Sequence, residues 1–216
     1  MRYSVVIVAA GKSERFSSNT NKMFYQLNEN HTVIDKTVSI FLNDENCKQV
    51  IVVLNEEGMN YYQNQNKCGK LVLVIGGSNR MESVYNGLMA ITEEKVLIHD
   101  GARPWVELSS IHDLVKVLDE EEAALLTIPM QDTVKKIEDG YVVATVDRST
   151  LVRAQTPQGF KSEELRKCYK EAFSKNIICT DDAEVFQIIT NKKIKCVVGS
   201  VENEKITTIE DIKRRS

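Results

Sequence analysis

The clearest chemical signal lies near the amino terminus, where an apolar segment ends in small residues and is followed by two cations. Residues 5–8 are Val and Ile only, a pattern typical of a buried parallel strand. Residues 9–11 are Ala-Ala-Gly, which would let backbone amides approach a ligand closely. Arg15 and Lys22 then add permanent positive charge. Amides and cations at the carboxyl end of a first strand predict a binding site for a nucleoside triphosphate.

A second glycine turn follows another strand-like segment. Gly76, Gly77 and Ser78 come directly after the apolar residues 71–75, and Ser83 lies about one helical turn further on. Adjacent glycines would allow the backbone to contact a flat ligand such as a base. A plain strand-to-helix turn would use the same residues, but nearness to the first glycine turn favours a binding role.

An acidic residue, Asp100, ends a third apolar segment. A carboxylate at the carboxyl end of a strand, beside a nucleotide seat, suits a Mg²⁺ ligand. Asp100 could instead cap a turn or pair with Arg103. Its neighbour His99 is expected to be a buried, hydrogen-bonded histidine and not a catalyst.

Positive charges recur late in the chain. Arg103, Arg148 and Lys205 join Arg15 and Lys22, and together these cations exceed what one nucleotide needs. Two phosphorylated ligands would explain the excess.

A helix start is predicted at Thr180-Asp181-Asp182. Acidic residues in a first turn interact favourably with the helix dipole, so capping is the expected role of both aspartates. The Thr180 hydroxyl could serve the site as well.

The composition is that of an ordinary globular protein of 216 residues, with 42% hydrophobic and 27% charged residues. A net charge of −3 argues against nucleic-acid or anionic-membrane binding. We expect no membrane span and no signal peptide. Five scattered cysteines are typical of reduced thiols, so a cytoplasmic protein is expected.

Strand-like and helix-like segments alternate along the chain, which predicts parallel βαβ units in a three-layer α/β fold of one domain, residues 1–216. The predicted strands are residues 4–8, 49–54, 71–75, 95–99, 123–128 and 195–198. The predicted helices are residues 33–42, 58–65, 80–91, 109–118, 162–173 and 181–189.

A β-hairpin interrupts this alternation. Residues 133–137 and 141–146 are β-rich and flank Glu138-Asp139-Gly140, where Asp-Gly is a strong turn signal. The hairpin is either a plain surface ribbon or an arm, at about residues 130–155, that pairs with another subunit.

Several segments resemble the 2-C-methyl-D-erythritol 4-phosphate cytidylyltransferases of the non-mevalonate isoprenoid pathway, in the order and spacing of that family. They are AAGKSERF with NKMFY, GGSNRMESVYNGL, HDGARPWV, QDTVKK, TVDRSTLVRAQTPQGF, CTDDAEVF and NEKITTIEDI. The resemblance implies a Rossmann-like nucleotidyltransferase domain with a mostly parallel sheet and a protruding β-arm that forms a homodimer. It also implies transfer of CMP from CTP to methylerythritol phosphate, with release of pyrophosphate.

The resemblance assigns roles to residues at the matched positions. Arg15 and Lys22 would bind the triphosphate and stabilise charge at the α-phosphorus. Asp100 would help hold Mg²⁺ (or Mn²⁺), CTP and the sugar phosphate. Cytosine and ribose would be held by Ala9, Ala10, Gly11, Gly77, Ser78 and Ser83. The acceptor would be contacted by Asp100, Arg103, Thr180 and Lys205, with Thr133 and Arg148 from the arm of a second subunit. Thr156 would either order the pocket or contact the acceptor.

The chain also departs from the family pattern. Asn21 replaces the proline before the catalytic lysine, and Gly101 replaces the first alanine of HDAARP. The other departures are Ser13, Phe16, Met23, Glu204 and Ile209. None of them removes a charged catalytic group.

Three alternatives compete with this interpretation. A ribitol-5-phosphate cytidylyltransferase of cell-wall polymer synthesis shares the nucleotide motifs, but the TVDR and HDGARP segments favour the isoprenoid family. A glycosyltransferase of related fold would carry an Asp-x-Asp metal motif, which the sequence lacks. Retention of the charged groups argues against a non-catalytic nucleotide-binding protein.

Overall fold

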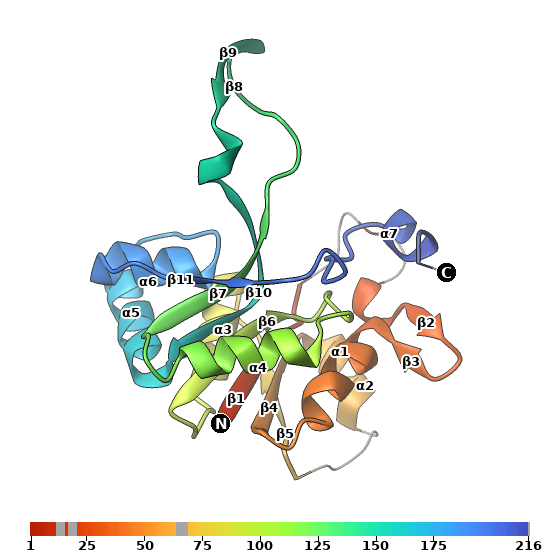
Figure 1. Cartoon of the computed structure of the whole chain (residues 1–216). Coiled ribbons are helices and arrows are strands. Elements are labelled where there is room, and N and C mark those ends of the chain that lie inside the picture. The colour runs from red at the N-terminus through yellow and green to blue at the C-terminus, as the bar shows by residue number, and fades with distance from the viewer. Residues whose placement is uncertain (12–15, 17–20, 64–68, 216) are drawn as a thin grey trace.

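A seven-stranded sheet forms the centre of the part of the chain that the computed structural model describes, residues 1–11, 16, 21–63 and 69–215 (Figure 1). Strand β10 runs antiparallel to both of its neighbours, and the other paired strands are parallel. The carboxyl ends of the parallel strands therefore meet at one edge. In spatial order the strands are β11 (Lys195–Val198), β7 (Ala123–Pro129), β10 (Val152–Lys161), β6 (Lys95–Asp100), β1 (Tyr3–Val8), β4 (Cys47–Leu54) and β5 (Leu71–Ile75).

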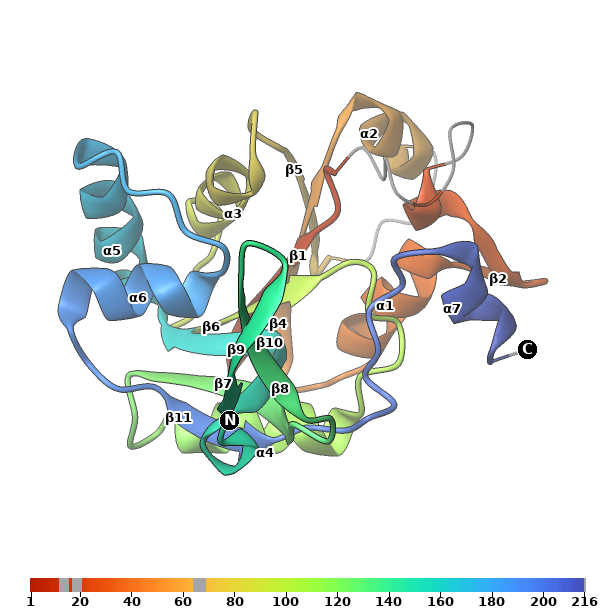
Figure 2. The same ribbon diagram turned by 90° about the horizontal axis from the view of Figure 1, so that it is seen from above.

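Helices cover both faces of the sheet and give the predicted three layers (Figure 2). One face carries α1 (Val33–Leu42), α2 (Glu56–Gln63) and α4 (Leu108–Val117). The other carries α3 (Arg80–Leu88), α5 (Ser162–Ser174) and α6 (Asp182–Thr190). Because strand side chains alternate, Val5 and Ile7 join the first core and Val6 joins the second. Burial on both faces explains why β1 is a continuous apolar run.

Strand β10 has no counterpart among the predicted strands. Its central residues, Gln155 to Gly159, are polar, small or proline, so they show neither an apolar run nor alternation. They are nevertheless buried, because β10 lies between β6 and β7. The pairing register with β7 shifts between Ala154 and Gln158, beside the cis peptide bond Thr156–Pro157. Buried polar side chains here are satisfied by neighbouring loops, which sequence periodicity cannot indicate.

Short elements complete the described fold. They were not predicted, because a few residues leave no periodic pattern. Helix α3 ends at Leu88, before the predicted limit at residue 91. No helix in the described ranges is long and apolar enough to cross a membrane. The short elements are η1 (Lys22–Phe24), β2 (Gln26–Asn28), β3 (His31–Thr32), η2 (Arg148–Thr150) and α7 (Ile209–Lys213).

The predicted hairpin is present and projects from the body of the molecule (Figure 1). It consists of β8 (Val134–Glu138) and β9 (Tyr141–Val146). The turn residues Asp139 and Gly140 have φ values of 49° and 83°, the left-handed region that an Asp-Gly pair tolerates. Ile137 and Tyr141 are 65% and 77% exposed, so this arm leaves apolar side chains uncovered.

Candidate active site

The two predicted glycine turns lie beside each other at the carboxyl edge of the sheet. The Ala9 amide donates to a β4 carbonyl at 2.9 Å, which keeps the chain leaving β1 against its neighbour. A Cβ atom at Gly76 would lie 2.5 Å from the Cβ atom of Ala10, so only glycine fits there without displacing the first turn. Gly11 follows Ala10 and is exposed. The structure thus brings together the segments predicted to hold the nucleoside.

Two serines order the second turn. The buried Ser83 hydroxyl accepts a hydrogen bond from the Gly77 amide at 3.1 Å and donates one to the Asn79 carbonyl at 2.8 Å. The Ser78 amide and hydroxyl both donate to Glu82 at 2.8 Å, and these bonds lower the pKa of the Glu82 carboxyl. Ser78 itself remains exposed. The turn is therefore held from within, and one of its faces is open to solvent.

Asp100 lies among three cations at the end of β6. Its Oδ2 atom is 2.7 Å from Lys205 Nζ and 3.8 Å from Arg103 Nε, and its Oδ1 atom is 3.8 Å from Arg80 Nη2. Burial alone would raise the pKa of the Asp100 carboxyl, but the charges of Lys205 and Arg80 outweigh burial and hold this pKa well below its usual range. Of the three roles considered from sequence, a Mg²⁺ ligand, a turn cap and a partner of Arg103, the structure shows the pairing with Arg103, although Lys205 is much closer. Asp100 therefore presents an ionised carboxylate at the site.

Two buried residues, Thr156 and His99, extend a hydrogen-bond chain from the Asp100 backbone into the protein. The Thr156 hydroxyl accepts from the Asp100 amide at 3.0 Å, so its single hydrogen is directed to His99 Nδ1 at 3.1 Å. His99 Nε2 then carries the ring proton and donates to the Arg103 carbonyl at 3.1 Å. Complete burial lowers the pKa of His99 to about 4. His99 is the satisfied core histidine that the sequence predicted, and the buried Thr156 orders the site from within.

Arg103 turns toward the segment before Lys205. Its Nη1 atom donates to the Asn203 carbonyl at 2.6 Å. Its Nε atom is buried and has no hydrogen-bond partner among the described residues. Burial also lowers the pKa of the Arg103 guanidinium. A buried donor without a partner is costly unless a ligand satisfies it, which fits an anion-binding role.

Lys22 is presented by the short helix η1. The Asn21 side chain accepts from the Met23 amide at 3.1 Å and so caps this turn. Asn21 Nδ2 also donates to Glu57 on α2 at 3.3 Å. Asparagine thus orders, through hydrogen bonds, a turn where proline would restrict the backbone. Lys22 Nζ donates to the Ile206 carbonyl at 3.1 Å. Because Ile206 directly follows Lys205 in the sequence, this bond brings Lys22 to the segment that carries Lys205.

Residues 204–208, here called the Lys205 segment, are anchored at Ile206 and at the carboxyl end. The Ile206 side chain is fully buried, and its amide donates to the Ala102 carbonyl at 2.9 Å. Beyond it, the amides of Thr207 and Thr208 both donate to Asp211 Oδ2 at 2.8 Å. Sequence reasoning missed Asp211, although Thr-x-x-Asp before an apolar residue is a capping-box signal. Asp211 therefore holds the segment that carries Lys205.

The free energy of unfolding at acid pH should show the contribution of the Asp211 carboxylate. Burial by itself would raise the pKa of Asp211, but hydrogen bonds from the Thr208 and Thr207 amides outweigh it and lower the pKa to about 2. The folded pKa lies below the usual value near 4, so the ionised carboxylate stabilises the fold above pH 4 by about 2 kcal/mol and loses this effect as the pH falls toward 2. Urea unfolding of wild type and Asp211→Asn should differ by that amount at pH 7 and converge at low pH. A difference that does not change with pH would contradict the assignment.

The prediction that both aspartates cap a helix is correct for Asp181 and wrong for Asp182. The Asp181 side chain accepts from the Glu184 amide at 2.8 Å at the start of α6. Asp182 is fully buried and makes a two-pronged ion pair with Arg80, at 2.7 Å and 3.2 Å. The aspartate is inside the protein because a cation from α3 compensates its charge. Thr180 is exposed, and its hydroxyl donates to Glu184 at 2.8 Å.

Other predicted site residues lie on the arm or outside the described residues. Thr133 immediately precedes β8, and Arg148 follows β9 and donates to the Gln131 carbonyl at 2.5 Å. Both are exposed, and the arm that carries them projects away from the sheet (Figure 1). Arg15 and the departure at Ser13 lie outside the described residues.

The remaining departures from the family pattern are accommodated in the fold. Phe16 is buried with its ring 5.4 Å from that of Tyr25, and Met23 is buried as well. A Cβ atom at Gly101 would lie 3.0 Å from the Cβ atom of Ala9, so alanine here would need a small local shift. Glu204 lies 3.9 Å from the Arg215 guanidinium, and Ile209 begins α7.

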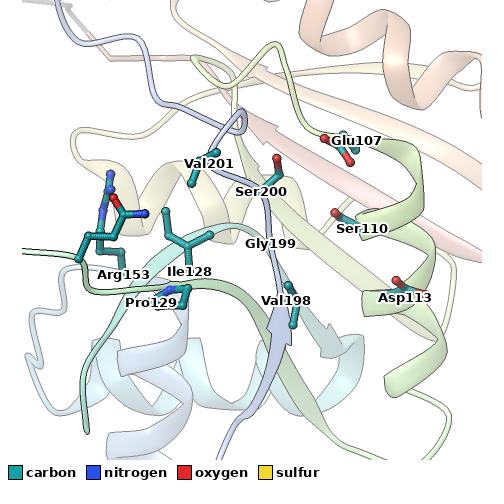
Figure 3. Close-up of a pocket in the computed structure, with 11 residues that line it drawn as sticks. Glu107, Ser110, Asp113, Ile128, Pro129, Arg153, Val198, Gly199, Ser200 and Val201 are labelled. Carbon is teal, nitrogen blue, oxygen red and sulfur yellow. The ribbon is translucent and has the colours of Figure 1, made fainter. Parts of the chain in front are cut away.

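A separate cavity of about 530 Å³ lies between the start of α4 and the residues after β11 (Figure 3). Acidic side chains, Glu107 and Asp113, line one side, and Val198 and Val201 line another. None of the predicted site residues lines it. The cavity is therefore distinct from the charged cluster around Asp100.

Glycine turns and clustered charges at the carboxyl ends of a mostly parallel three-layer sheet define a nucleotide-binding enzyme of the nucleotidyltransferase class. The comparisons with known proteins agree with this class. The chain belongs to the 2-C-methyl-D-erythritol 4-phosphate cytidylyltransferase (IspD) family, whose model matches residues 3–215.

Relatives and solved structures extend over nearly the whole chain. A Bacillus anthracis protein named 2-C-methyl-D-erythritol 4-phosphate cytidylyltransferase is 39% identical over 215 residues, covering 97% of this chain and 94% of the relative. One of the same name from Clostridioides difficile is 36% identical, with 97% and 90% covered. The crystal structure of the Francisella tularensis enzyme has a TM-score of 0.85 at 30% identity, covering 100% of this chain and 98% of that one. The Thermus thermophilus structure gives 0.82 at 28%, covering 99% and 97%. These names do not favour the ribitol phosphate alternative.

Proposed function

We propose that this protein transfers CMP from CTP to 2-C-methyl-D-erythritol 4-phosphate, giving 4-diphosphocytidyl-2-C-methyl-D-erythritol and pyrophosphate. The observation that carries the proposal is the cluster around Asp100, where Lys205, Arg103 and Arg80 lie within 3.8 Å of one carboxylate. The cluster adjoins the glycine turns, so cationic groups that can receive phosphates stand beside a seat for a nucleoside. The names of the relatives supply the acceptor.

The reaction needs no general base. A phosphomonoester has a second pKa near 6, so at pH 7 the acceptor oxygen is already an anionic nucleophile. That oxygen forms a bond to the α-phosphorus of CTP, and the bond between this phosphorus and the bridging oxygen of pyrophosphate breaks. His99, the histidine nearest the site in sequence, is buried, neutral and fully hydrogen-bonded, which fits chemistry without a base. Catalysis then depends on positioning and on stabilising negative charge.

Cations carry the proposed catalytic roles. Lys22 and Arg15 stabilise charge at the α-phosphorus and on the leaving pyrophosphate. Lys205 and Arg148 place the acceptor phosphate for attack, and Arg103 binds it with the buried Nε atom, which has no hydrogen-bond partner among the described residues. The cytidine would be held by Ala9, Ala10, Gly11, Gly77, Ser78 and Ser83, and the acceptor in addition by Thr133 and Thr180.

Mg²⁺, or Mn²⁺ in its place, is the proposed cofactor. Among the described residues no group of three His, Cys, Asp or Glu side chains could hold a metal, so Asp100 would bind the ion together with phosphate oxygens of CTP. The ionised carboxylate of Asp100 fits that hard cation. When bound, the ion neutralises charge on the transferring phosphate.

A second subunit is part of the proposal. The exposed apolar side chains of the arm, Ile137, Tyr141 and Val142, suit contact with another copy of the chain. Thr133 and Arg148 lie on the same arm, so pairing through it would bring them toward the site of the partner. We propose a homodimer of this kind, each chain forming one cytidylyltransferase domain. The free thiols Cys47, Cys168, Cys179 and Cys196 support action in the reducing cytoplasm.

Pyrophosphate release tests the proposed reaction. The purified protein should release pyrophosphate from CTP and Mg²⁺ with methylerythritol phosphate, and should not do so with ribitol 5-phosphate or without acceptor. If only ribitol 5-phosphate supports turnover, the acceptor is ribitol 5-phosphate and not methylerythritol phosphate. Absence of turnover with both acceptors would refute the proposed activity.

A further inference from the structure

Arg80 joins two carboxylates, Asp100 and Asp182, that lie far apart in the sequence. Its two terminal nitrogens contact Asp182 at 3.2 Å and 2.7 Å, and Nη2 also lies 3.8 Å from Asp100 Oδ1. The Arg80 side chain is 32% exposed, whereas that of Asp182 is fully buried. The guanidinium thus extends from the interior of the protein to the edge of the site.

The buried partner of Arg80 is itself fixed. The Tyr169 hydroxyl on α5 donates to Asp182 Oδ1 at 2.5 Å, and Tyr169 is fully buried. An aspartate with these partners has little freedom to rotate, and planar two-pronged pairing fixes the guanidinium as well. Arg80 is therefore held in place by α5 and α6 in the absence of any ligand.

The three cations around Asp100 are not equivalent. Lys205 and Arg103 face Oδ2, and only Arg80 faces Oδ1 among the described residues. Under the proposed function, Lys205 also binds the acceptor phosphate, so its ammonium is shared between Oδ2 and that phosphate. Arg80 has no such second task, because Asp182 anchors it.

We propose that Arg80, held by Asp182 and Tyr169, is a positioning residue that keeps the Asp100 carboxylate oriented throughout cytidylyl transfer. This inference rests on the proposed function. Arg80 acts through Asp100, and a change at Asp182, which no described contact joins to Asp100, should disturb the reaction through Arg80.

Kinetics of graded substitutions test the proposal. Arg80→Gln should lower kcat roughly 10- to 100-fold, a loss common when the support of a metal-binding carboxylate is removed. Asp182→Asn should lower kcat by a similar factor, and Tyr169→Phe by less. Arg80→Lys should retain only part of the activity, because the ammonium keeps the positive charge but cannot form the two-pronged pair with Asp182. The calorimetric affinity for CTP without metal should stay within about threefold of wild type, a small free-energy difference, because Arg80 is proposed to act on Asp100 and not on the nucleotide.

Arg166 provides a matched control for structural damage. It is also an arginine that links distant segments, donating to the Leu88 and Ile91 carbonyls at 2.9 Å and 2.6 Å, but it does not contact Asp100. Arg166→Gln should lower the melting temperature and leave kcat unchanged. A double-mutant cycle completes the test: in an Asp100→Asn background, Arg80→Gln should have little further effect on residual turnover.

Three outcomes would overturn the inference. They are full kcat in folded Arg80→Gln, additive losses in the cycle with Asp100→Asn, and a loss of CTP affinity as large as the loss of kcat, which would make Arg80 a nucleotide contact. The activities of wild type and Arg166→Gln distinguish failure of the proposed function from failure of the proposed role of Arg80. If neither turns over, the proposed function fails, and if both do while Arg80→Gln matches them, only the role of Arg80 fails.

Discussion

Lys22→Ala is expected to lower kcat for pyrophosphate release roughly 100- to 1,000-fold, the effect of removing a preorganised charge that acts on a developing anion. The η1 turn presents this ammonium, and its bond to the Ile206 carbonyl places it beside the segment that carries Lys205. Neither the Asn21 cap nor the burial of Met23 depends on the Lys22 side chain, so the turn should persist. Initial rates with saturating CTP and methylerythritol phosphate, together with circular dichroism, would measure both effects.

A second lysine supplies the control for this experiment. Lys70 donates to the Leu42 and Asp44 carbonyls at 3.4 Å and 3.0 Å, so it too holds the backbone of another segment. It precedes β5, whereas the site follows the carboxyl ends of the strands. Lys70→Ala should keep its kcat. A Lys22→Ala enzyme within tenfold of wild type would remove Lys22 from the chemistry.

The layered fold follows from residue pattern to a large extent. Alternation of Val5, Val6 and Ile7 between two cores requires helices on both faces of the sheet, and the α1 boundaries agree with the predicted residues 33–42. Strand β10 could not be predicted in this way. Its buried Gln155 and Gln158 are satisfied by contacts with residues that lie 23 to 48 positions away in sequence.

From residue pattern alone, the site was predictable where it follows strand ends, whereas the roles of Lys22 and Lys205 were assigned through the family resemblance. Asp100 and the glycine turns directly follow apolar segments, so topology alone brings them together. The pairs that position them join residues far apart in sequence. Arg80 and Asp182 are 102 positions apart, and Lys22 and Ile206 are 184 apart. In the sequence, Asp182 resembled a capping residue, because an acidic first turn looks the same whether its carboxylate faces solvent or a buried arginine.

In the proposed homodimer, the cation on the arm serves the active site of the partner subunit. Arg148 is exposed on a hairpin that projects away from the sheet, whereas Lys205 contacts Asp100 at 2.7 Å in the body. Both are proposed to place the acceptor phosphate. If the arm reaches a partner, each site takes Lys205 from one chain and Arg148 from the other. Damage to the two residues should then be separable by mixing chains.

Mixing Lys205→Ala with Arg148→Ala should therefore restore activity that neither variant has alone. At a ratio of one to one, half of the dimers are mixed and each mixed dimer has one intact site, so recovery should approach about a quarter of wild-type activity per chain. Chains tagged differently, coexpressed and purified through both tags, would supply the mixed dimers alone, and these should reach about half of wild-type activity per chain in pyrophosphate assays. The control pairs Lys205→Ala with Lys22→Ala, two changes in the same body, and should show no recovery, because no arrangement of these chains contains an intact site. If the first mixture behaves as the average of its two parents, Arg148 serves its own chain and the proposed exchange of arms is wrong.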